Sequence, residues 1–285
     1  MQAIELNGAA VEANKRAFQW GRMAMHDPAF VASRVEDTTE ERPVAAAEDA
    51  VISGTSDERI ARRVEFLTAY QNAGYAARYS SLVDKVRQAE SRILPEGDRR
   101  LSDAVATGYF RVLAIKDEYE VARLYTNGQF RRQLESVFEG DYKIRYHLAP
   151  PLWAHTDKTL GVPKKRTYGE WLTPFLHLLR MMRPLRGTAL DIFGYTEERR
   201  LERSLIVNYE ETVAEILAHL SAQNVDTALS LARLPEGIRG YGHVKRKSID
   251  EAREREVRLR AQLRGEPVPP SSSHSLRRII EIQSA

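Results

Sequence analysis

The amino-acid sequence predicts a mainly α-helical domain that carries a small antiparallel β element and is preceded by a detached N-terminal helix. Apolar residues recur three and four positions apart along most of residues 58–265, which is the spacing of one helix face. Residues 142–148 alternate between apolar and polar side chains, as in a strand with one buried face. An acidic stretch at residues 27–57 separates residues 1–26 from these patterns and is predicted to be an exposed linker.

Residues 1–26 are predicted to form one helix, because apolar side chains recur there at seven-residue intervals. Burying one such side chain fully stabilises a protein by about 1.5–3 kcal/mol, so leaving all of them exposed is costly. We therefore expect the helix to need a packing partner. This partner would be the helical domain of the same chain, a second copy of the chain or a separate subunit. The apolar stripe consists of Ile4, Val11, Phe18 and Met25.

After the linker, helices are expected to resume at about Glu58, with a break at Gly74. A helical period then covers residues 104–125. In residues 142–148, tyrosine, isoleucine and leucine occupy one face, and lysine, arginine and histidine occupy the other. A return strand through residues 164–168 would complete a small hairpin.

The last part of the domain is predicted to contain three helices. Tyr168–Met182 is strongly apolar and is expected to be the central buried helix. Thr196 is expected to cap the next helix, and Ser248 and Glu251 to form a capping box for the last one, which Gly265 ends. The predicted organisation is a helix at residues 1–26, an acidic linker at 27–57, a helical domain at 58–265, and a linker and tail at 266–285.

Composition excludes several functions. Among 285 residues, 43 basic and 40 acidic side chains leave a net charge of +3, which is too small to indicate a nucleic-acid or membrane partner. No apolar run is long enough to cross a bilayer, and no signal peptide is evident, so we expect a cytoplasmic protein. The chain has no cysteine, so it forms no disulfide and holds no cysteine-ligated iron–sulfur cluster by itself.

The strongest candidate binding site is a glycine-containing basic segment, residues 239–247. Its backbone amides and cations are of the kind that approach a phosphate, such as that of coenzyme A. The alternative is a flexible, solvated connection that precedes the cap at Ser248. The candidate anion-binding residues are Arg239, Gly240, Gly242, His243 and Lys245.

An acidic tract offers a second candidate site, because Asp117, Glu118 and Glu120 contain enough carboxylates for an acid–base pair. Asp117 and Glu118, however, point about 100° apart on a helix. We favour a structural role, in which these acids pair with Lys116, Arg123 or the basic face of the strand. No residue is therefore assigned a catalytic role.

Three further sets of side chains are interpreted as structural. The seven histidines lack the spacing of metal ligands, so no metal site is predicted. His147 is expected on the polar strand face, exposed or hydrogen-bonded. The basic cluster at residues 164–166 is interpreted as the solvated edge of the hairpin; the alternative is a docking site for an acidic ferredoxin-like protein. The three tryptophans, Trp20, Trp153 and Trp171, are expected in the core or at an interface.

Four sequence runs carry a resemblance to a known family. They are KDEYEVARLYT, FEGDYKIRYHLAPPL, LRGTALDIFGYTEERRLERSLI and LPEGIRGYGHVK. Together they resemble the C-terminal region of the fused indolepyruvate ferredoxin oxidoreductases, members of the 2-oxoacid:ferredoxin oxidoreductase superfamily, over about residues 101–265. Residues 1–26 resemble the end of the gamma-type catalytic domain that precedes this region in those enzymes.

The resemblance implies that this chain is either the tail of a much larger enzyme or a separate gene product that corresponds to such a tail. The parent enzymes use thiamine diphosphate, magnesium and iron–sulfur clusters. Their Gly-Asp-Gly run for thiamine diphosphate is absent here, since Gly97-Asp98 is followed by two arginines. No cofactor is therefore expected in this chain, and we expect it not to be catalytic alone.

Three functions remain open. The first, which we favour, is an accessory module that supports assembly of the catalytic domains of such an oxidoreductase. The second is an anion- or coenzyme A-binding contribution to its active site through residues 239–247. The third is an independent helical adaptor. The expected partners are other domains or subunits of the oxidoreductase and, through residues 1–26, a second copy of the chain.

Overall fold

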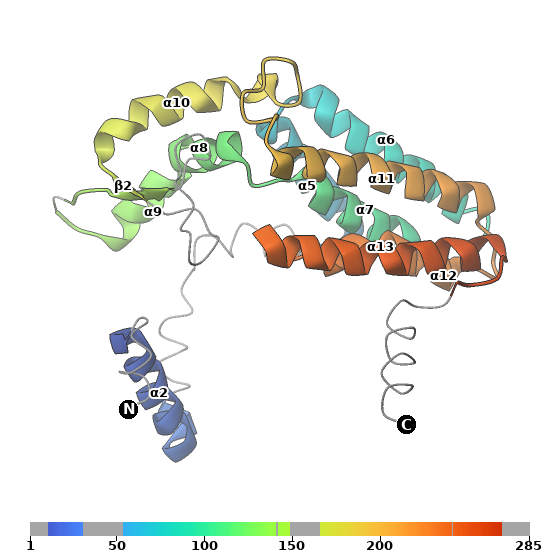
Figure 1. Cartoon of the computed structure of the whole chain (residues 1–285), viewed down its shortest axis with the longest axis horizontal. Coiled ribbons are helices and arrows are strands. Elements are labelled where there is room, and N and C mark those ends of the chain that lie inside the picture. Colours follow the sequence, from blue (N-terminus) through green and yellow to red (C-terminus); the bar gives the residue numbers. More distant parts are fainter. Residues whose placement is uncertain (1–10, 31–53, 141, 149–165, 241, 270–285) are drawn as a thin grey trace, which may run out of the picture. The chain divides into compact units, whose positions relative to one another are not determined.

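The computed structural model describes residues 11–30, 54–140, 142–148, 166–240 and 242–269. Within them the protein is mainly helical and carries a two-stranded antiparallel sheet, as the sequence predicts (Figure 1). The chain divides into two compact units, residues 1–53 and residues 54–285.

The described part of the first unit is dominated by helix α2, Val11–His26. Two members of the predicted stripe are exposed on it, since Met25 is 87% exposed and Phe18 is half exposed. Ile4 lies outside the described residues. Trp20, which we expected in a core or at an interface, is also half exposed. The large apolar side chains of α2 are therefore mostly exposed.

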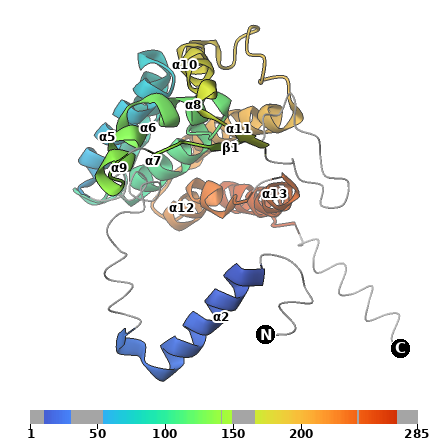
Figure 2. The ribbon, with the colours of Figure 1, turned by 90° about the vertical axis from the view of Figure 1, so that its left-hand side faces the viewer.

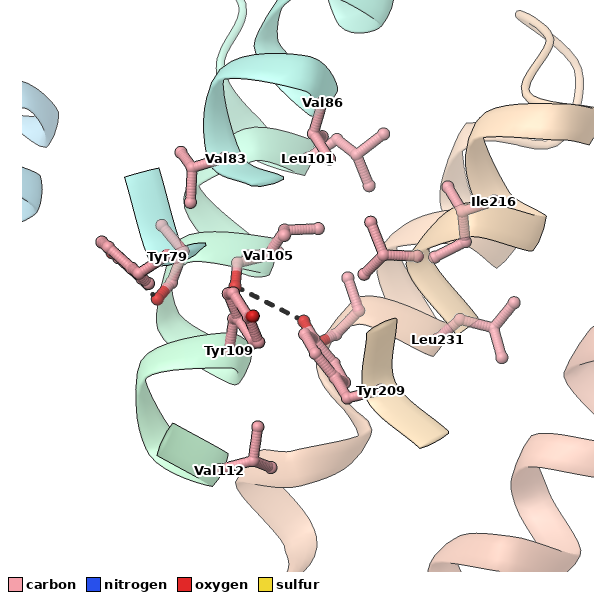
Figure 3. Close-up of a cluster of buried hydrophobic side chains, with 14 of the residues drawn as sticks. Tyr79, Val83, Val86, Leu101, Val105, Tyr109, Val112, Tyr209, Ile216 and Leu231 are labelled. Atoms are coloured by element: carbon pink, nitrogen blue, oxygen red, sulfur yellow. Dashed lines mark hydrogen bonds between the residues drawn. The ribbon is translucent and has the colours of Figure 1, made fainter. Parts of the chain in front are cut away.

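A helical bundle forms the larger part of the second unit, around a first hydrophobic cluster. Three tyrosine rings stack through its centre, with 5.9 Å between the ring centroids of Tyr79 and Tyr109 and the same distance between Tyr109 and Tyr209 (Figure 3). The Tyr209 hydroxyl donates to the carbonyl oxygen of Ala232 at 2.8 Å, so the buried ring is also hydrogen-bonded. The elements are α5 (Ser56–Tyr70), α6 (Ala73–Glu90), α7 (Arg100–Leu113), α11 (Glu197–His219), α12 (Val225–Ala232), η3 (Leu234–Gly237) and α13 (Gly242–Arg264).

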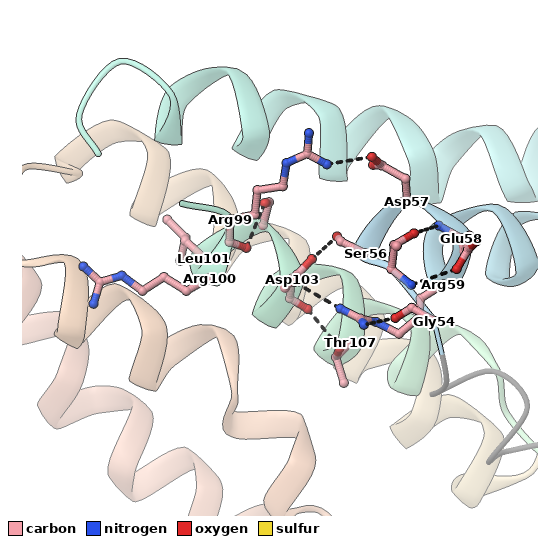
Figure 4. A network of polar contacts seen from close by, with 12 residues as sticks. Gly54, Ser56, Asp57, Glu58, Arg59, Arg99, Arg100, Leu101, Asp103 and Thr107 are labelled. Carbon is pink, nitrogen blue, oxygen red and sulfur yellow. Dashed lines mark hydrogen bonds and ion pairs between the residues drawn. The ribbon is translucent and has the colours of Figure 1, made fainter. Parts of the chain in front are cut away.

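Local capping residues set the start of the bundle. Thr55 and Glu58 form a capping box, so α5 begins slightly before the predicted start at Glu58. Beyond this turn, Arg59 of α5 pairs with Asp103 of α7 at 3.1 Å (Figure 4). The break between α5 and α6 falls at residues 71–72 and not at Gly74. The Asn72 side chain caps α6 by accepting from an amide in its first turn, so the helix begins at Ala73.

A smaller second cluster contains α8 (Glu118–Thr126), α10 (Thr173–Met181) and the hairpin of β1 (Tyr146–Leu148) and β2 (Arg166–Tyr168). Helix α8 packs alongside α10 in both views (Figures 1 and 2). The helical period predicted over residues 104–125 is split between α7 and α8. Three short elements flank these, namely α9 (Gln129–Val137), η1 (Glu170–Leu172) and η2 (Arg183–Leu185).

The hairpin is shorter than predicted. Tyr146 pairs with Tyr168 and Leu148 with Arg166 in antiparallel register. The predicted alternation of buried and exposed side chains holds over residues 142–148, but the backbone amide of Ile144 donates to the Glu170 carboxylate at 2.9 Å. A side chain therefore takes the position of a partner strand at Ile144, and among the described residues the ladder contains three residue pairs.

The prediction that residues 168–182 form the central buried helix is wrong. Only one side of η1 and α10 packs into the second cluster, through Leu172, Leu176 and Leu179. On the other side Trp171 and Met181 are 70% and 76% exposed. The physical reason is position, because α10 lies at the edge of the small cluster with α8 as its main helical neighbour.

The predicted capping box at Ser248 and Glu251 is also wrong, because α13 already begins at Gly242. The Ser248 hydroxyl instead accepts from the Arg239 amide at 3.2 Å, and the Glu251 carboxylate lies 4.0 Å from Lys247. Two other boundaries are confirmed. Thr196 caps α11, and α13 ends at Arg264, where the following Gly265 has a φ of +72°.

Replacing Gly108 with alanine tests how closely α7 packs against α11 and α12. An added Cβ atom would overlap the carbonyl oxygen of Ala232 and the hydroxyl of Tyr209. Helix propensity alone favours alanine by about 1 kcal/mol, whereas overpacking costs about 1–3 kcal/mol. We expect Gly108→Ala to lower the free energy of unfolding in urea. Gly237→Ala, where the added atom meets open space, is the control; a stabilised Gly108 variant would contradict the close approach.

Candidate functional site

The basic segment at residues 239–247 is tied into the bundle. The Arg239 guanidinium donates to the carbonyl oxygen of Glu236 at 3.1 Å, and the Lys245 ammonium pairs with Glu202 at 2.5 Å. Gly240 and Gly242 have φ angles of +90° and +56°, which glycine adopts readily. The side chain of His243 lies outside the described structure. Arg239 and Lys245, the two cations of this candidate site whose side chains are described, thus bond groups of the protein itself.

Asp117 is a buried structural carboxylate. It caps α8 by accepting from the Glu120 amide at 2.9 Å. It also forms a two-pronged pair with Arg186, with N–O distances of 2.5 and 2.8 Å. The two side chains are only 6% and 11% exposed, so each charge depends on the other for compensation.

The neighbouring acids also bond arginines. Glu120 makes two hydrogen bonds of 2.8 Å with Arg123, which confirms one of the pairings predicted for this tract. Glu118 lies 3.4 Å from Arg199, a partner that the sequence did not suggest. Burial raises the pKa of Glu118, and the positive charge of Arg199 offsets part of that effect.

Arg186 joins the second cluster to the end of α5. Its guanidinium lies 3.6 Å from the centroid of the Tyr70 ring, and it donates to the Tyr70 carbonyl oxygen at 2.7 Å. Arg183 donates to the neighbouring carbonyl oxygen, that of Ala69, at 2.6 Å. The last carbonyls of a helix lack intrahelical donors and carry partial negative charge, so they suit both arginines.

A second chain of charges links three helices. Arg199 of α11 bonds Glu118 of α8 and Glu202 of its own helix. Glu202 in turn pairs with Lys245 of α13. This network therefore holds α8, α11 and α13 together, and it accounts for the position of Lys245.

Asp191 organises the turn that precedes α11. Its carboxylate accepts from the amides of Gly187 and Gly194 at 2.8 and 3.1 Å, and from the Tyr119 hydroxyl at 3.1 Å. Burial and the nearby Asp191 charge raise the pKa of Tyr119, so this phenol stays protonated as a donor.

The structure also places the remaining residues considered above. His147 is exposed, with its ring 3.1 Å from the Thr167 hydroxyl, as expected for the polar strand face. Arg166 is exposed at the hairpin edge, whereas residues 164–165 and Trp153 lie outside the described residues. Among the residues that are described, no group of three histidine or acidic side chains is placed to hold a metal ion. In the same residues no helix has the length and apolar character needed to span a membrane.

The sequence alone did not identify Arg186, Asp191, Arg199 or Glu202. Arg186 and Asp191 are single charges within the mostly uncharged residues 185–196, whereas Arg199 and Glu202 lie in the charged run 197–203. The first two carried a usable signal, because an isolated charge among apolar residues needs a partner from elsewhere in the fold.

Fold and site together define an α-helical domain whose central charges are paired with one another. Residues 56–258 match the model of a family described as "Family of unknown function (DUF6537)". The match covers more than half of the chain, and the chain belongs to this family. No curated protein and no solved structure matches it.

Removing the Arg186 side chain tests whether the buried pair is structural. Arg186→Ala leaves Asp117 buried without its cation, which costs about 3–5 kcal/mol. We expect that loss in the free energy of unfolding measured in urea. Arg131→Ala is the control, because Arg131 and Glu135 form an exposed pair on α9 worth less than about 1 kcal/mol. An equal, small loss in both variants would contradict the structural role.

Proposed function

We propose that this chain is a non-catalytic accessory module of an indolepyruvate-type 2-oxoacid:ferredoxin oxidoreductase, working in the cytoplasm. In this proposal it packs against the other domains or subunits of the enzyme and supports their assembly. The sequence runs that resemble the C-terminal region of those enzymes support this choice of partner. The observation that carries the proposal is an apolar stripe along η1 and α10, which we call the α10 stripe.

The α10 stripe faces away from the second cluster. Its members are separated by three or four residues, so they share one side of the helix. An exposed apolar surface of this kind marks an interaction site. Covering each large side chain fully is worth about 1.5–3 kcal/mol before the costs of association. The stripe consists of Trp171, Phe175, Leu178 and Met181.

The ion pairs of the buried acids support a structural rather than a catalytic role. Asp117 is held by Arg186, Glu120 by Arg123, and Glu202 by Arg199 and Lys245. A general base must lie within hydrogen-bond reach of the proton that it takes from a substrate, whereas the oxygens of these carboxylates bond cations of the protein itself. These groups are better suited to holding helices together.

Helix α2 provides a second interaction surface in this proposal. Its exposed side chains, Phe18, Trp20, Met23 and Met25, are apolar and large. We propose that α2 associates with a second copy of the chain or with the catalytic body of the oxidoreductase.

Gel filtration with the catalytic domains of an indolepyruvate ferredoxin oxidoreductase tests the docking surface. We expect the wild-type chain to co-elute with them. The double variant Trp171→Glu/Met181→Glu should elute separately, because two buried carboxylates would oppose the interface. Its own stability should change by no more than about 0.5 kcal/mol per substitution, as is usual for exposed positions.

Val257→Glu is the matched control, since Val257 is an exposed apolar residue of α13, outside the α10 stripe. It should co-elute like the wild type. Failure of the wild-type chain to bind the catalytic domains would overturn the proposal in favour of an independent helical adaptor. Binding by the double variant would exclude the α10 stripe as the interface.

Deleting residues 1–50 tests the role of α2. We expect the truncated chain to keep the melting temperature of the helical domain, because these residues belong to a separate unit. Any dimer seen for the full chain by light scattering should be reduced. Unfolding of the truncated chain would show that the first unit is integral to the fold.

A further inference from the structure

A groove of about 400 Å³ lies between α11 and α13. Ile249 and Leu201 contribute apolar surface to it, and three arginines line it: Arg200 from α11, and Arg246 and Arg253 from α13. The volume falls within the range of small-molecule sites. The groove thus combines an apolar base with cations from two helices.

The spacing of the two helices is fixed by ion pairs and hydrogen bonds beside the groove. Lys245 pairs with Glu202 at 2.5 Å, and the Asn208 amide donates to Glu256 at 2.9 and 3.0 Å. Farther along, Arg260 pairs with Glu215 at 2.5 Å. Because these contacts link α11 to α13 at successive turns, the groove is formed without a ligand, which lowers the cost of binding.

The three arginines of the groove differ in whether a carboxylate neutralises their charge. Arg246 pairs with Glu197 at 2.9 Å. The side chains of Arg200 and Arg253 form no ion pair or hydrogen bond with any residue that the structure describes. Asp250 also lines the groove but lies beyond ion-pair distance of both. Three arginines against two carboxylates leave a net positive charge, and two guanidinium groups keep their donors available.

We propose that this groove binds a small molecule through a phosphate group. Guanidinium groups recognise phosphate oxygens through paired, charge-assisted hydrogen bonds, which lysine and neutral donors do not reproduce. Arg200 and Arg253 approach from opposite walls and contact the phosphate, while Leu201 contacts the apolar part of the ligand above the nearly buried Ile249. This site extends beyond the proposed accessory role and uses none of the residues of the α10 stripe.

The site also differs from the segment that the sequence suggested. Only Arg246 is shared with residues 239–247. Lys245, which we considered for anion binding, is held by Glu202 instead. The cations that remain available come from positions 200 and 253, which are distant in sequence and meet only because α11 and α13 pack together.

Amide chemical shifts of the full chain, titrated with inorganic phosphate, test the proposal. Sodium chloride at matched ionic strength controls for screening. We expect saturable shifts around positions 200, 246 and 253 with phosphate only. The double variant Arg200→Ala/Arg253→Ala should bind at least about tenfold more weakly, which corresponds to about 1.4 kcal/mol.

Two further variants sharpen the test. Arg255→Ala removes a cation from the same helix about 200° away from Arg253, so it should bind phosphate like the wild type. Glu197→Gln removes a carboxylate that competes for Arg246, so it should bind phosphate more tightly. Shifts that chloride reproduces, or equal losses in the Arg255 variant and the double variant, would overturn the proposal.

Discussion

Arg186 is the residue on which the joining of the two hydrophobic clusters depends. It follows η2 in sequence and reaches back to the end of α5, where it stacks on Tyr70, bonds its carbonyl oxygen and neutralises Asp117. Asp117 in turn caps α8. One buried cation therefore fixes the end of a bundle helix and the start of a helix in the second cluster. Since both charges are largely shielded from water, the pair is effective only while both clusters are in place.

The acidic tract, residues 117–120, likewise has a structural role. Carboxylates that a sequence presents together become chemically useful when they converge on a cavity with their basicity intact. Here Asp117, Glu118 and Glu120 diverge to different arginines, and each joins a contact that positions a helix. The surfaces that remain for recognition are different in kind: an apolar stripe on α10, and a basic groove between α11 and α13.

Local patterns in the sequence predicted the helical class, the buried face of residues 142–148, the cap at Thr196 and the end at Gly265, because each depends on neighbouring residues. Tertiary partners decided the rest. Ser248 resembles a cap in sequence but bonds Arg239 instead. The apolar pattern of residues 168–182 predicts a buried helix. Burial of α10 on both sides would require packing elements on its outer side, and among the described residues the small cluster covers only its inner side. The pairing of Arg186 with Asp117 spans 69 residues and had no local signature.

We infer that Arg186 makes the two clusters one cooperative unit. Amide hydrogen exchange of the wild type and Arg186→Ala, compared helix by helix, tests it most directly. In the wild type, α8 and α10 should open with the same free energy as α7 and α11. In the variant, protection of α8 and α10 should fall well below that of α7 and α11. Equal protection of all four helices in the variant would contradict the claim, and would assign the joining of the clusters to contacts other than those of Arg186.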